Sequence, residues 1–367
     1  MNINNNNNFK SFQNFLDFYK KDIKCDFQEV LKGALFDISK QNDNIFSNYS
    51  SEDSQKLIKN KYIHKFLFDN IAKFCENTGK MQRPLTCLLS YLSCGGDSSK
   101  IDEIVPIALS IELFQNSALI HDDIADEAKL RRGVECLHVT YGIPIALYCG
   151  NYFIGISNYI IHKYCKNNLI KSKILYELNN MQLVTCQGQV LDISFSKQKH
   201  LNFTEEEYKF MAKNKTAYYS FVAPCIIGAI CTNSTQETIN SLKSFGIYLG
   251  LAFQIMDDIA NLDKNVYDKD YLSDIKEGKI TLITTYAINH LCSEDSLKLK
   301  KILKKKNNSS EQLFEALQLI NKCGAIKYAQ NKAKEFCLNA KDTLKSANLD
   351  NLWSKLLFDM PNWVLNN

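Results

Sequence analysis

The sequence has few of the residues that end helices and form turns. It contains 14 glycines and 5 prolines in 367 residues, which favours long helices over a fold of many short strands. No apolar run reaches the roughly 18 residues that a spanning helix needs, and the longest candidate, Phe221 to Cys231, is too short. We therefore expect a soluble all-α protein without a transmembrane segment.

Neither the charge nor the cysteines indicate a nucleic-acid surface or a disulfide framework. The net charge of +4 is modest, so no nucleic-acid partner is expected. The 13 cysteines include no CxxC pair, which is typical of buried thiols in a reducing compartment. The expected location is cytoplasmic, with an organelle (mitochondrion or plastid) as the alternative if a presequence was removed.

Apolar residues recur at helical spacing along most of the chain. Residues 1–8 are asparagine-rich and expected to be disordered, whereas residues 9–367 are expected to form a single all-α bundle without strands. Thr204 to Glu207 reads as a capping box, and Pro361 should end the last helix. The predicted helices are Phe9 to Tyr19, Phe27 to Ile38, Leu57 to Cys75, Ile104 to Lys129, Ile143 to Tyr164, Ile170 to Phe195, Glu205 to Ile230, Glu237 to Leu262, Glu311 to Ala347 with a break at Gly324, and Leu352 to Met360, with loops at Gln41 to Asp53 and Lys300 to Ser310.

An acidic cluster interrupts one of the apolar stretches. Asp122, Asp123 and Asp126 are followed closely by Arg131 and Arg132. Residues four apart on a helix lie one above the other, so Asp122 and Asp126 would present oxygens on one side. Mg²⁺ is usually held by one or two carboxylates together with substrate phosphates, and arginines pair with phosphate. This cluster predicts a metal-diphosphate site.

A second cluster of similar form follows about 135 residues later. Asp257, Asp258 and Asn261 again lie in an apolar helical stretch. One such cluster is often only a solvated helix face. Two of them favour a pair of carboxylate walls that face each other across a bundle and hold several Mg²⁺ between them.

A third group, Gly79-Lys80-Met-Gln-Arg83-Pro84, places two cations three residues apart at the start of a helix, where backbone amides also favour anions. The motifs of the chain, taken in order, are Gly-Lys-x-x-Arg-Pro, Asp-Asp-x-x-Asp followed by Arg-Arg-Gly, Lys-Thr, and Phe-Gln-x-x-Asp-Asp. They resemble those of the trans-isoprenyl diphosphate synthases. These are the chain-elongating prenyltransferases. The resemblance covers about residues 75 to 285 and implies a helical bundle of the isoprenoid synthase type with a central apolar tunnel.

The resemblance also implies an activity and its participants. Isopentenyl diphosphate would condense with an allylic diphosphate to give an all-trans polyprenyl diphosphate and release diphosphate. A homodimer, three Mg²⁺ per site and a peripheral membrane contact for product release are implied as well. Carried over by position, the metal ligands are Asp122, Asp126 and Asp257, with Asp123 and Asp258 as auxiliary acids. The residues that would bind isopentenyl diphosphate are Lys80, Arg83, Gln115 and Arg132. Those that would bind the allylic diphosphate are Arg131, Gln189, Lys215, Thr216, Lys269 and Lys279, with Asp192 beside them and Asp274 in the segment that closes over the site. The residues expected to act in catalysis are Asp122, Asp126, Lys215 and Asp257.

Small residues precede the first acidic cluster. Ser117 and Ala118 lie one turn below the acids, where synthases that stop at farnesyl tend to carry bulky aromatics. Phe114 lies a further turn down, about 5–6 Å deeper, which is about one isoprene unit. A product of geranylgeranyl length or longer is therefore expected, with a farnesyl diphosphate synthase as the alternative.

Several of these residues also have a purely structural interpretation. Gln115 could be a satisfied core amide, and Thr216 could bond back to its own helix. His121 is expected to pack rather than to ligate, and Phe253 with Gln254 could serve packing alone.

The sequence departs from the family pattern at two positions. Asn261 replaces an aspartate, which predicts weaker Mg²⁺ affinity, although its amide oxygen could still approach a metal-bound water. Asp268 replaces a glycine before Lys269, so that loop is expected to differ. Because only one acid has changed, a non-catalytic subunit of a heteromeric synthase is the less favoured alternative. A class I terpene cyclase or a head-to-head condensing enzyme is disfavoured, because neither would need the second, metal-free diphosphate pocket that Lys80, Arg83 and Arg132 indicate.

Overall fold

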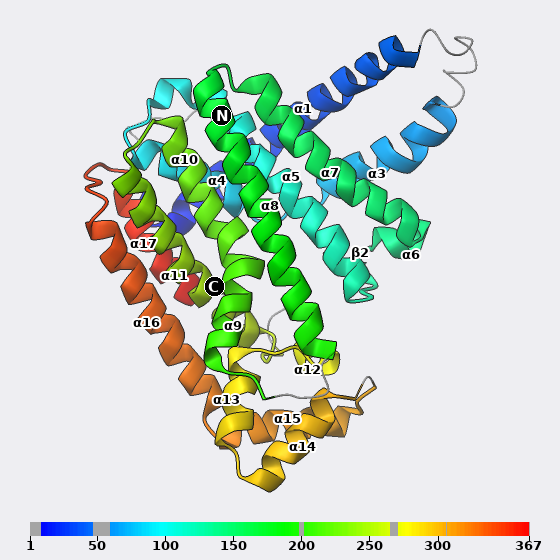
Figure 1. The fold of residues 1–367 in the computed structure, drawn as a ribbon, viewed down its shortest axis with the longest axis vertical. Coiled ribbons are helices and arrows are strands. Elements are labelled where there is room, and N and C mark those ends of the chain that lie inside the picture. Colours follow the sequence, from blue (N-terminus) through cyan, green and yellow to red (C-terminus); the bar gives the residue numbers. More distant parts are fainter. Residues whose placement is uncertain (1–8, 47–58, 198–201, 265–270, 306, 367) are drawn as a thin grey trace. The chain divides into compact units, whose positions relative to one another are not determined.

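Helices make up nearly all of the computed structural model, as predicted (Figure 1). The structure describes residues 9–46, 59–197, 202–264, 271–305 and 307–366, so the predicted disorder of residues 1–8 lies outside them. The described helices are α1 (Phe12–Phe46), η1 (Lys59–Phe68), α3 (Asp69–Glu76), α4 (Gln82–Ser93), η2 (Ser98–Lys100), α5 (Ile101–Ala125), α6 (Leu137–Tyr141), α7 (Ile143–Tyr164), α8 (Asn168–Lys197), α9 (Glu205–Ala212), η3 (Lys213–Val222), α10 (Ala223–Cys231), α11 (Gln236–Ala260), α12 (Ser273–Glu277), α13 (Leu282–His290), α14 (Ser293–Leu303), α15 (Ser310–Lys322), α16 (Ala325–Lys345) and α17 (Ser354–Asn366).

The chain divides into two compact units. The first unit runs to Leu178 and includes Ile227–Asn233, and the second comprises Asn179–Ile226 and Ser234–Asn367. The single domain over residues 9–367 stays a prediction.

The core of the first unit is built on α5. This helix is buried along most of its length and packs against α7, α4 and α1. The stretch Ser98–Ala125 is apolar and long enough to cross a membrane, but 78% of its most apolar window is buried inside the structure. No other described helix meets that test. Its hydrophobicity therefore matches the requirements of a core helix.

The N-terminal segment forms one helix where the sequence predicted two helices and a loop. α1 runs without a break to Phe46, so the loop predicted from Gln41 is wrong for residues 41–46. The buried side chains Tyr19, Ile23 and Phe27 follow one another at four-residue spacing, and this spacing keeps them on one helix face. Ile23 thus continues the apolar stripe through the polar stretch that had suggested a break.

A short hairpin contradicts the expectation that the chain would contain no strand. β1 (Leu130–Arg131) pairs antiparallel with β2 (Val134–Glu135). These are the only strands among the described residues. The turn between them consists of Arg132 and Gly133, whose φ angles are 52° and 77°. Two successive positive φ angles are typical of a type I′ turn, which joins antiparallel strands tightly.

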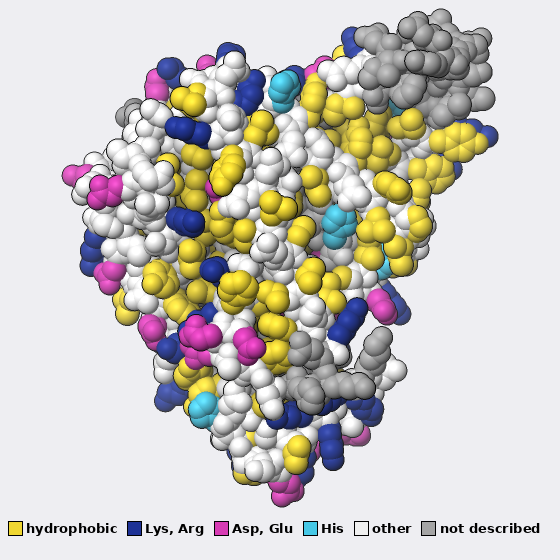
Figure 2. All heavy atoms as spheres, viewed as in Figure 1, with side chains coloured by type: hydrophobic (Ala, Val, Ile, Leu, Met, Phe, Trp, Pro, Cys, Tyr) yellow, Lys and Arg dark blue, Asp and Glu magenta, His cyan; other side chains and the backbone are white. Residues whose placement is uncertain are grey.

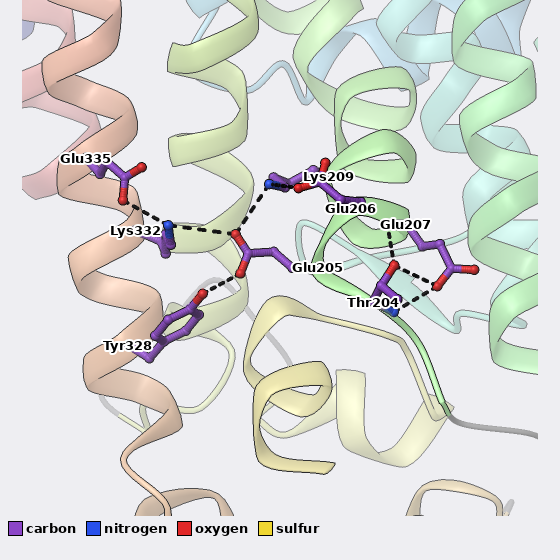
Figure 3. A network of polar contacts seen from close by, with 8 residues as sticks. All are labelled: Thr204, Glu205, Glu206, Glu207, Lys209, Tyr328, Lys332 and Glu335. Carbon is purple, nitrogen blue, oxygen red and sulfur yellow. Dashed lines mark hydrogen bonds and ion pairs between the residues drawn. The ribbon is translucent and has the colours of Figure 1, made fainter. Parts of the chain in front are cut away.

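In the second unit, α11 packs mainly against α16 and η3. The predicted capping box is confirmed at the start of α9 (Figure 3): Thr204 Oγ1 accepts a hydrogen bond from Glu207 N at 3.2 Å, and Glu207 Oε2 accepts one from Thr204 N at 2.8 Å. Glu205, beside the cap, accepts a hydrogen bond from the Tyr328 hydroxyl and lies 3.9 Å from Lys332 Nζ. These contacts tie α9 to α16.

The last part of the chain confirms one prediction and corrects another. The break at Gly324 is confirmed, and this residue has a φ of 72°. Pro361 does not end the last helix, because α17 continues through it to Asn366. The turn after Pro361 buries Trp363 and Val364, and this burial compensates for the hydrogen bond that proline cannot donate.

Candidate active site

The first acidic cluster lies at the C-terminal end of α5. Asp126 N donates to Asp122 O at 2.9 Å, so the two half-buried residues stand one turn apart, as predicted. Asp123 is buried, and its Oδ1 accepts hydrogen bonds from Arg131 Nε, at 2.8 Å, and from Arg131 Nη2. Asp123 therefore holds the guanidinium of Arg131, while Asp122 and Asp126 remain the candidate ligands of this cluster.

The loop that precedes α4 lies against Arg132. Asn77 O accepts a hydrogen bond from Arg132 Nη1, and Asn77 Nδ2 donates to Arg132 O at 3.1 Å. A Cβ atom on Gly79 would lie only 2.6 Å from Arg132 Nη2, so a larger residue would displace the guanidinium. The Gly79-to-Arg83 group and Arg132, which are far apart in sequence, are thus brought together in the first unit.

One acidic side chain of α5 faces this basic group. Glu112 is only 2% exposed, and its Oε2 has no hydrogen-bond partner among the described residues. Burial raises the pKa of Glu112, whereas the nearby cations Arg83, Arg132 and Lys24 lower it. Gln115, one turn further on, is also buried, with no partner for its Oε1 in the described part of the chain. The interpretation of Gln115 as a satisfied core amide is therefore wrong for this oxygen.

Sequence reasoning missed both Glu112 and Lys24. The signal was available for Glu112, because an acid in an apolar helix three residues before Gln115 shares its face. Lys24 gives no such signal, since only the fold brings α1 to this group.

The second acidic cluster lies at the end of α11 in the second unit. Asp258 is 5% exposed and accepts hydrogen bonds from Tyr208 Oη at 2.8 Å and from Gln254 Nε2 at 2.7 Å. Burial raises the pKa of Asp258 well above its usual range, and the carboxylates of Asp274 and Asp257 raise it further. Asp258 thus supports the cluster from the interior, whereas Asp257 is half-buried.

Two structural interpretations of this region are wrong. Gln254 does not serve packing alone, because its amide accepts a hydrogen bond from Thr216 Oγ1 and donates to Asp258. Thr216 correspondingly donates to Gln254 instead of bonding back to its own helix. Phe253 does pack, with its ring between those of Phe221 and Trp363.

The side chain of Asn261 bonds the segment that carries Asp274. It is buried, its Nδ2 donates to Ser273 Oγ at 2.7 Å, and its Oδ1 accepts from Asp274 N at 3.2 Å. The backbone oxygen of Asn261 also accepts from Leu272 N at 3.0 Å. Asn261 thus uses its amide oxygen to fix the segment that carries Asp274, and the expected approach of this oxygen to a metal-bound water stays a prediction.

The predicted allylic diphosphate residues of the second unit fall into two groups. Lys215 Nζ forms an ion pair with Asp192 Oδ2, and Gln189 lies half-buried on the same helix as Asp192. Lys279 forms an ion pair with Glu277 Oε2 at 2.9 Å. Lys269, together with Asp268 before it, lies outside the described residues, so the expected difference in that loop stays a prediction.

The predicted chain-length residues lie along α5. Phe114 and Ser117 are buried, and Ala118 is half-buried. His121 packs against α7, where a Cβ on Gly150 would lie 2.4 Å from its Nε2, which agrees with the packing role expected for it. The tunnel itself stays a prediction.

The residues present fit a hard divalent cation. The donors at each cluster are carboxylate oxygens, which Mg²⁺ prefers, and the mutual repulsion of Asp257, Asp258 and Asp274 is the kind that a bound cation relieves. No three His, Cys, Asp or Glu side chains of the described residues lie close enough to hold an ion by themselves. The two clusters belong to different units, so their facing arrangement stays a prediction.

Comparison with known proteins places the chain in a family. The sequence model of the family Polyprenyl synthetase matches residues 64–320. The geranylgeranyl diphosphate synthase of Sulfolobus acidocaldarius is 30% identical over 313 residues, which are 82% of this chain and 91% of that protein. The crystal structure of geranylgeranyl pyrophosphate synthetase from Pyrococcus horikoshii is 27% identical, with a TM-score of 0.75 over 93% of this chain and 99% of that one.

A further structure has the same fold at lower identity. It is a geranylgeranyl pyrophosphate synthase from Corynebacterium glutamicum complexed with isoprenyl diphosphate and magnesium, and it is 21% identical with a TM-score of 0.77 over 92% of this chain and 98% of that one. With its acidic ends of α5 and α11, its basic loop before α4 and this set of relatives, the chain belongs to the polyprenyl synthetase family of trans-isoprenyl diphosphate synthases.

Proposed function

We propose that the protein condenses isopentenyl diphosphate with an allylic diphosphate to give an all-trans polyprenyl diphosphate of geranylgeranyl length or longer. The observation that carries this proposal is the basic group that Arg83 and Arg132 form around the buried Glu112, with Lys80 on the adjoining loop. Such a group suits a second, metal-free diphosphate. Relatives with geranylgeranyl products support the length.

The reaction requires that a diphosphate leave the allylic substrate in a site from which water is excluded. Mg²⁺, when bound by Asp122, Asp126 and Asp257, would neutralise the charge of that leaving group, and three ions are expected by resemblance. Lys215 and Arg131, oriented by Asp192 and Asp123, would pair with the same diphosphate. Such contacts would strengthen as negative charge develops on the leaving diphosphate in the transition state, and this difference would accelerate the reaction.

The isopentenyl substrate would be bound separately. Lys80, Arg83 and Arg132 would hold its diphosphate, and Gln115, by resemblance to the family, would support the same site as a donor through its Nε2. Held in this way, the double bond of the substrate would attack the allylic cation, and this positioning would lower the barrier. The cationic adduct would then lose a proton, which by resemblance to the family goes to the released diphosphate.

Incubation of the lone protein with isopentenyl diphosphate, farnesyl diphosphate and Mg²⁺ tests the function. The protein should consume isopentenyl diphosphate without any added subunit, and EDTA should abolish the reaction. No consumption by the folded protein would favour the alternative, a non-catalytic subunit of a heteromeric synthase.

The length of the product rests on Ser117, Ala118 and Phe114. We expect the wild-type protein to release geranylgeranyl or longer diphosphates, and the Ser117→Phe variant to release mainly farnesyl diphosphate, because the ring would block the chain. Chromatography of the dephosphorylated products measures both. A wild-type protein that releases only farnesyl diphosphate would contradict the proposed length.

A homodimer is proposed from a stripe of exposed apolar residues on α8. These side chains recur every seven residues, a spacing that keeps them on one helix face, and hydrophobic side chains are visible over this part of the surface in Figure 2. They are Leu169, Tyr176, Leu183 and Val190, which are 65%, 75%, 65% and 62% exposed. Sedimentation of the wild type and of a Tyr176→Lys variant should give a dimer and a monomer, respectively.

The cellular location is proposed to be the cytoplasm. All 13 cysteines are free thiols in the structure, which suits a reducing compartment. Fractionation of the source cells would distinguish this location from a mitochondrion or plastid. Peripheral membrane contact for release of the apolar product is proposed on the resemblance alone.

A further inference from the structure

The N-terminal helix α1 precedes the residues that the family model matches, yet it contacts the loop before α4. Lys24 Nζ donates to Thr78 O at 3.2 Å, and Gln28 Nε2 donates to Cys75 O at 2.7 Å. The two donors lie four residues apart and therefore on one face of α1. This face consequently fixes the last turn of α3, at the carbonyl of Cys75, and the loop that follows it, at the carbonyl of Thr78.

The same loop determines where Arg132 lies. Between the two anchored carbonyls, Asn77 bonds both the side chain and the backbone oxygen of Arg132. Immediately after Thr78, Gly79 leaves just enough room for the guanidinium. A shift of the loop would move Arg132 and would also move Lys80, the next residue along the chain.

Charge links Lys24 to the same group. The charged residues that face its ammonium are Lys20, Arg132 and Glu112. Burial and the two cations lower the pKa of Lys24, whereas Glu112 raises it. The ammonium of Lys24 thus lies near other cations, where it donates to the carbonyl of Thr78 and is attracted by the buried carboxyl group of Glu112. An arriving diphosphate would relieve the repulsion.

We propose that Lys24 is a positioning residue of the isopentenyl diphosphate site, which holds the Thr78 carbonyl and thereby sets Gly79, Lys80 and Arg132 for the substrate. This inference rests on the proposed function, because it assigns a role within the same site. It adds to the site a helix that lies outside the motifs of the family.

Steady-state kinetics with one substrate varied at a time test the proposal. Lys24→Met should raise KM for isopentenyl diphosphate about tenfold, because a charge-assisted hydrogen bond is lost, with KM for the allylic substrate and kcat nearly unchanged. Lys24→Arg should restore most of the affinity. Lys21→Met is the matched control, since it removes the same charge from an exposed position on α1 and should leave both KM values unchanged.

Two results would overturn the proposal: a Lys24→Met variant with the KM values of Lys21→Met, or one in which both KM values rise equally. If Lys24→Met does not fold, the milder Lys24→Gln is judged by the same pair of KM values. Failure of the proposed function is recognised separately, because the wild-type protein would then consume no isopentenyl diphosphate.

Discussion

Replacement of Gly188 by alanine should weaken both the fold and the activity. Gly188 lies on α8, where a Cβ atom would be 2.1 Å from Lys215 N and 2.5 Å from the carbonyl carbon of Asn214. Ordinary contacts begin at 3.4 Å, so α8 and η3 would have to separate by more than 1 Å. The atoms in the way belong to the backbone and cannot rotate aside.

The magnitude follows from two opposing terms. Overpacking of this kind costs about 3 kcal/mol, and the gain from alanine in a helix offsets about 1 kcal/mol. The net loss of stability is therefore about 2 kcal/mol. Because the clash displaces Lys215, its ion pair with Asp192 should also be lost, and we expect kcat to fall about tenfold or more.

Urea unfolding with linear extrapolation measures the loss of stability. Gly33→Ala is the matched control, because Gly33 also lies within a helix but its Cβ would meet Tyr164 Oη at an ordinary 3.6 Å. This variant should gain about 0.5–1 kcal/mol. A Gly188→Ala protein as stable and as active as the wild type would refute the reasoning.

Three further predictions concern charge and burial. Asn261→Asp removes the donor to Ser273 and adds an acid beside Asp274. Urea unfolding of this variant should therefore show a lower stability than that of the wild type in EDTA, and Mg²⁺ should restore it. Equal stability of the variant in EDTA and in Mg²⁺ would contradict this. Glu112 has a raised pKa in the folded state, so its contribution to the free energy of unfolding is complete below about pH 4.5 and is lost as the pH rises through the raised pKa. Urea titrations at several pH values should show a smaller fall in this free energy for Glu112→Gln than for the wild type. An equal fall in both proteins would count against the prediction. Burial raises the pKa of Cys149 to about 11, so N-ethylmaleimide under native conditions should leave it intact by mass spectrometry and modify the exposed thiols of Cys25, Cys186 and Cys292.

The sequence predicted well wherever periodicity and spacing alone decide the structure. α7 has the predicted bounds, and the break at Gly324 follows from a residue that tolerates a positive φ. The proximity of Gly79 to the guanidinium of Arg132 also agrees with the motifs, which place Lys80 and Arg132 in one site. The errors occurred where tertiary burial prevails over a local rule, as at Pro361, beyond which buried side chains keep the helix going.

Side-chain bonding within the site could not be predicted from spacing. Spacing did not predict that the fold places a backbone amide and a hydroxyl within reach of the amide group of Asn261. Lys24 meets the loop before α4 only because α1 folds against it, a contact between residues 54 apart in sequence. Such long-range partners leave no trace in local patterns.

The tight turn of the hairpin has a consequence for what evolution can change here. Arg131 and Arg132 are neighbours, yet one is turned to the end of α5 and the other to the loop before α4. The two-residue turn fixes how the two strands pair, so one inserted residue would shift their register and move both arginines away from these partners. Substitutions at the exposed Val134 should therefore be tolerated, whereas a change of length by a single residue should weaken the binding of both diphosphates.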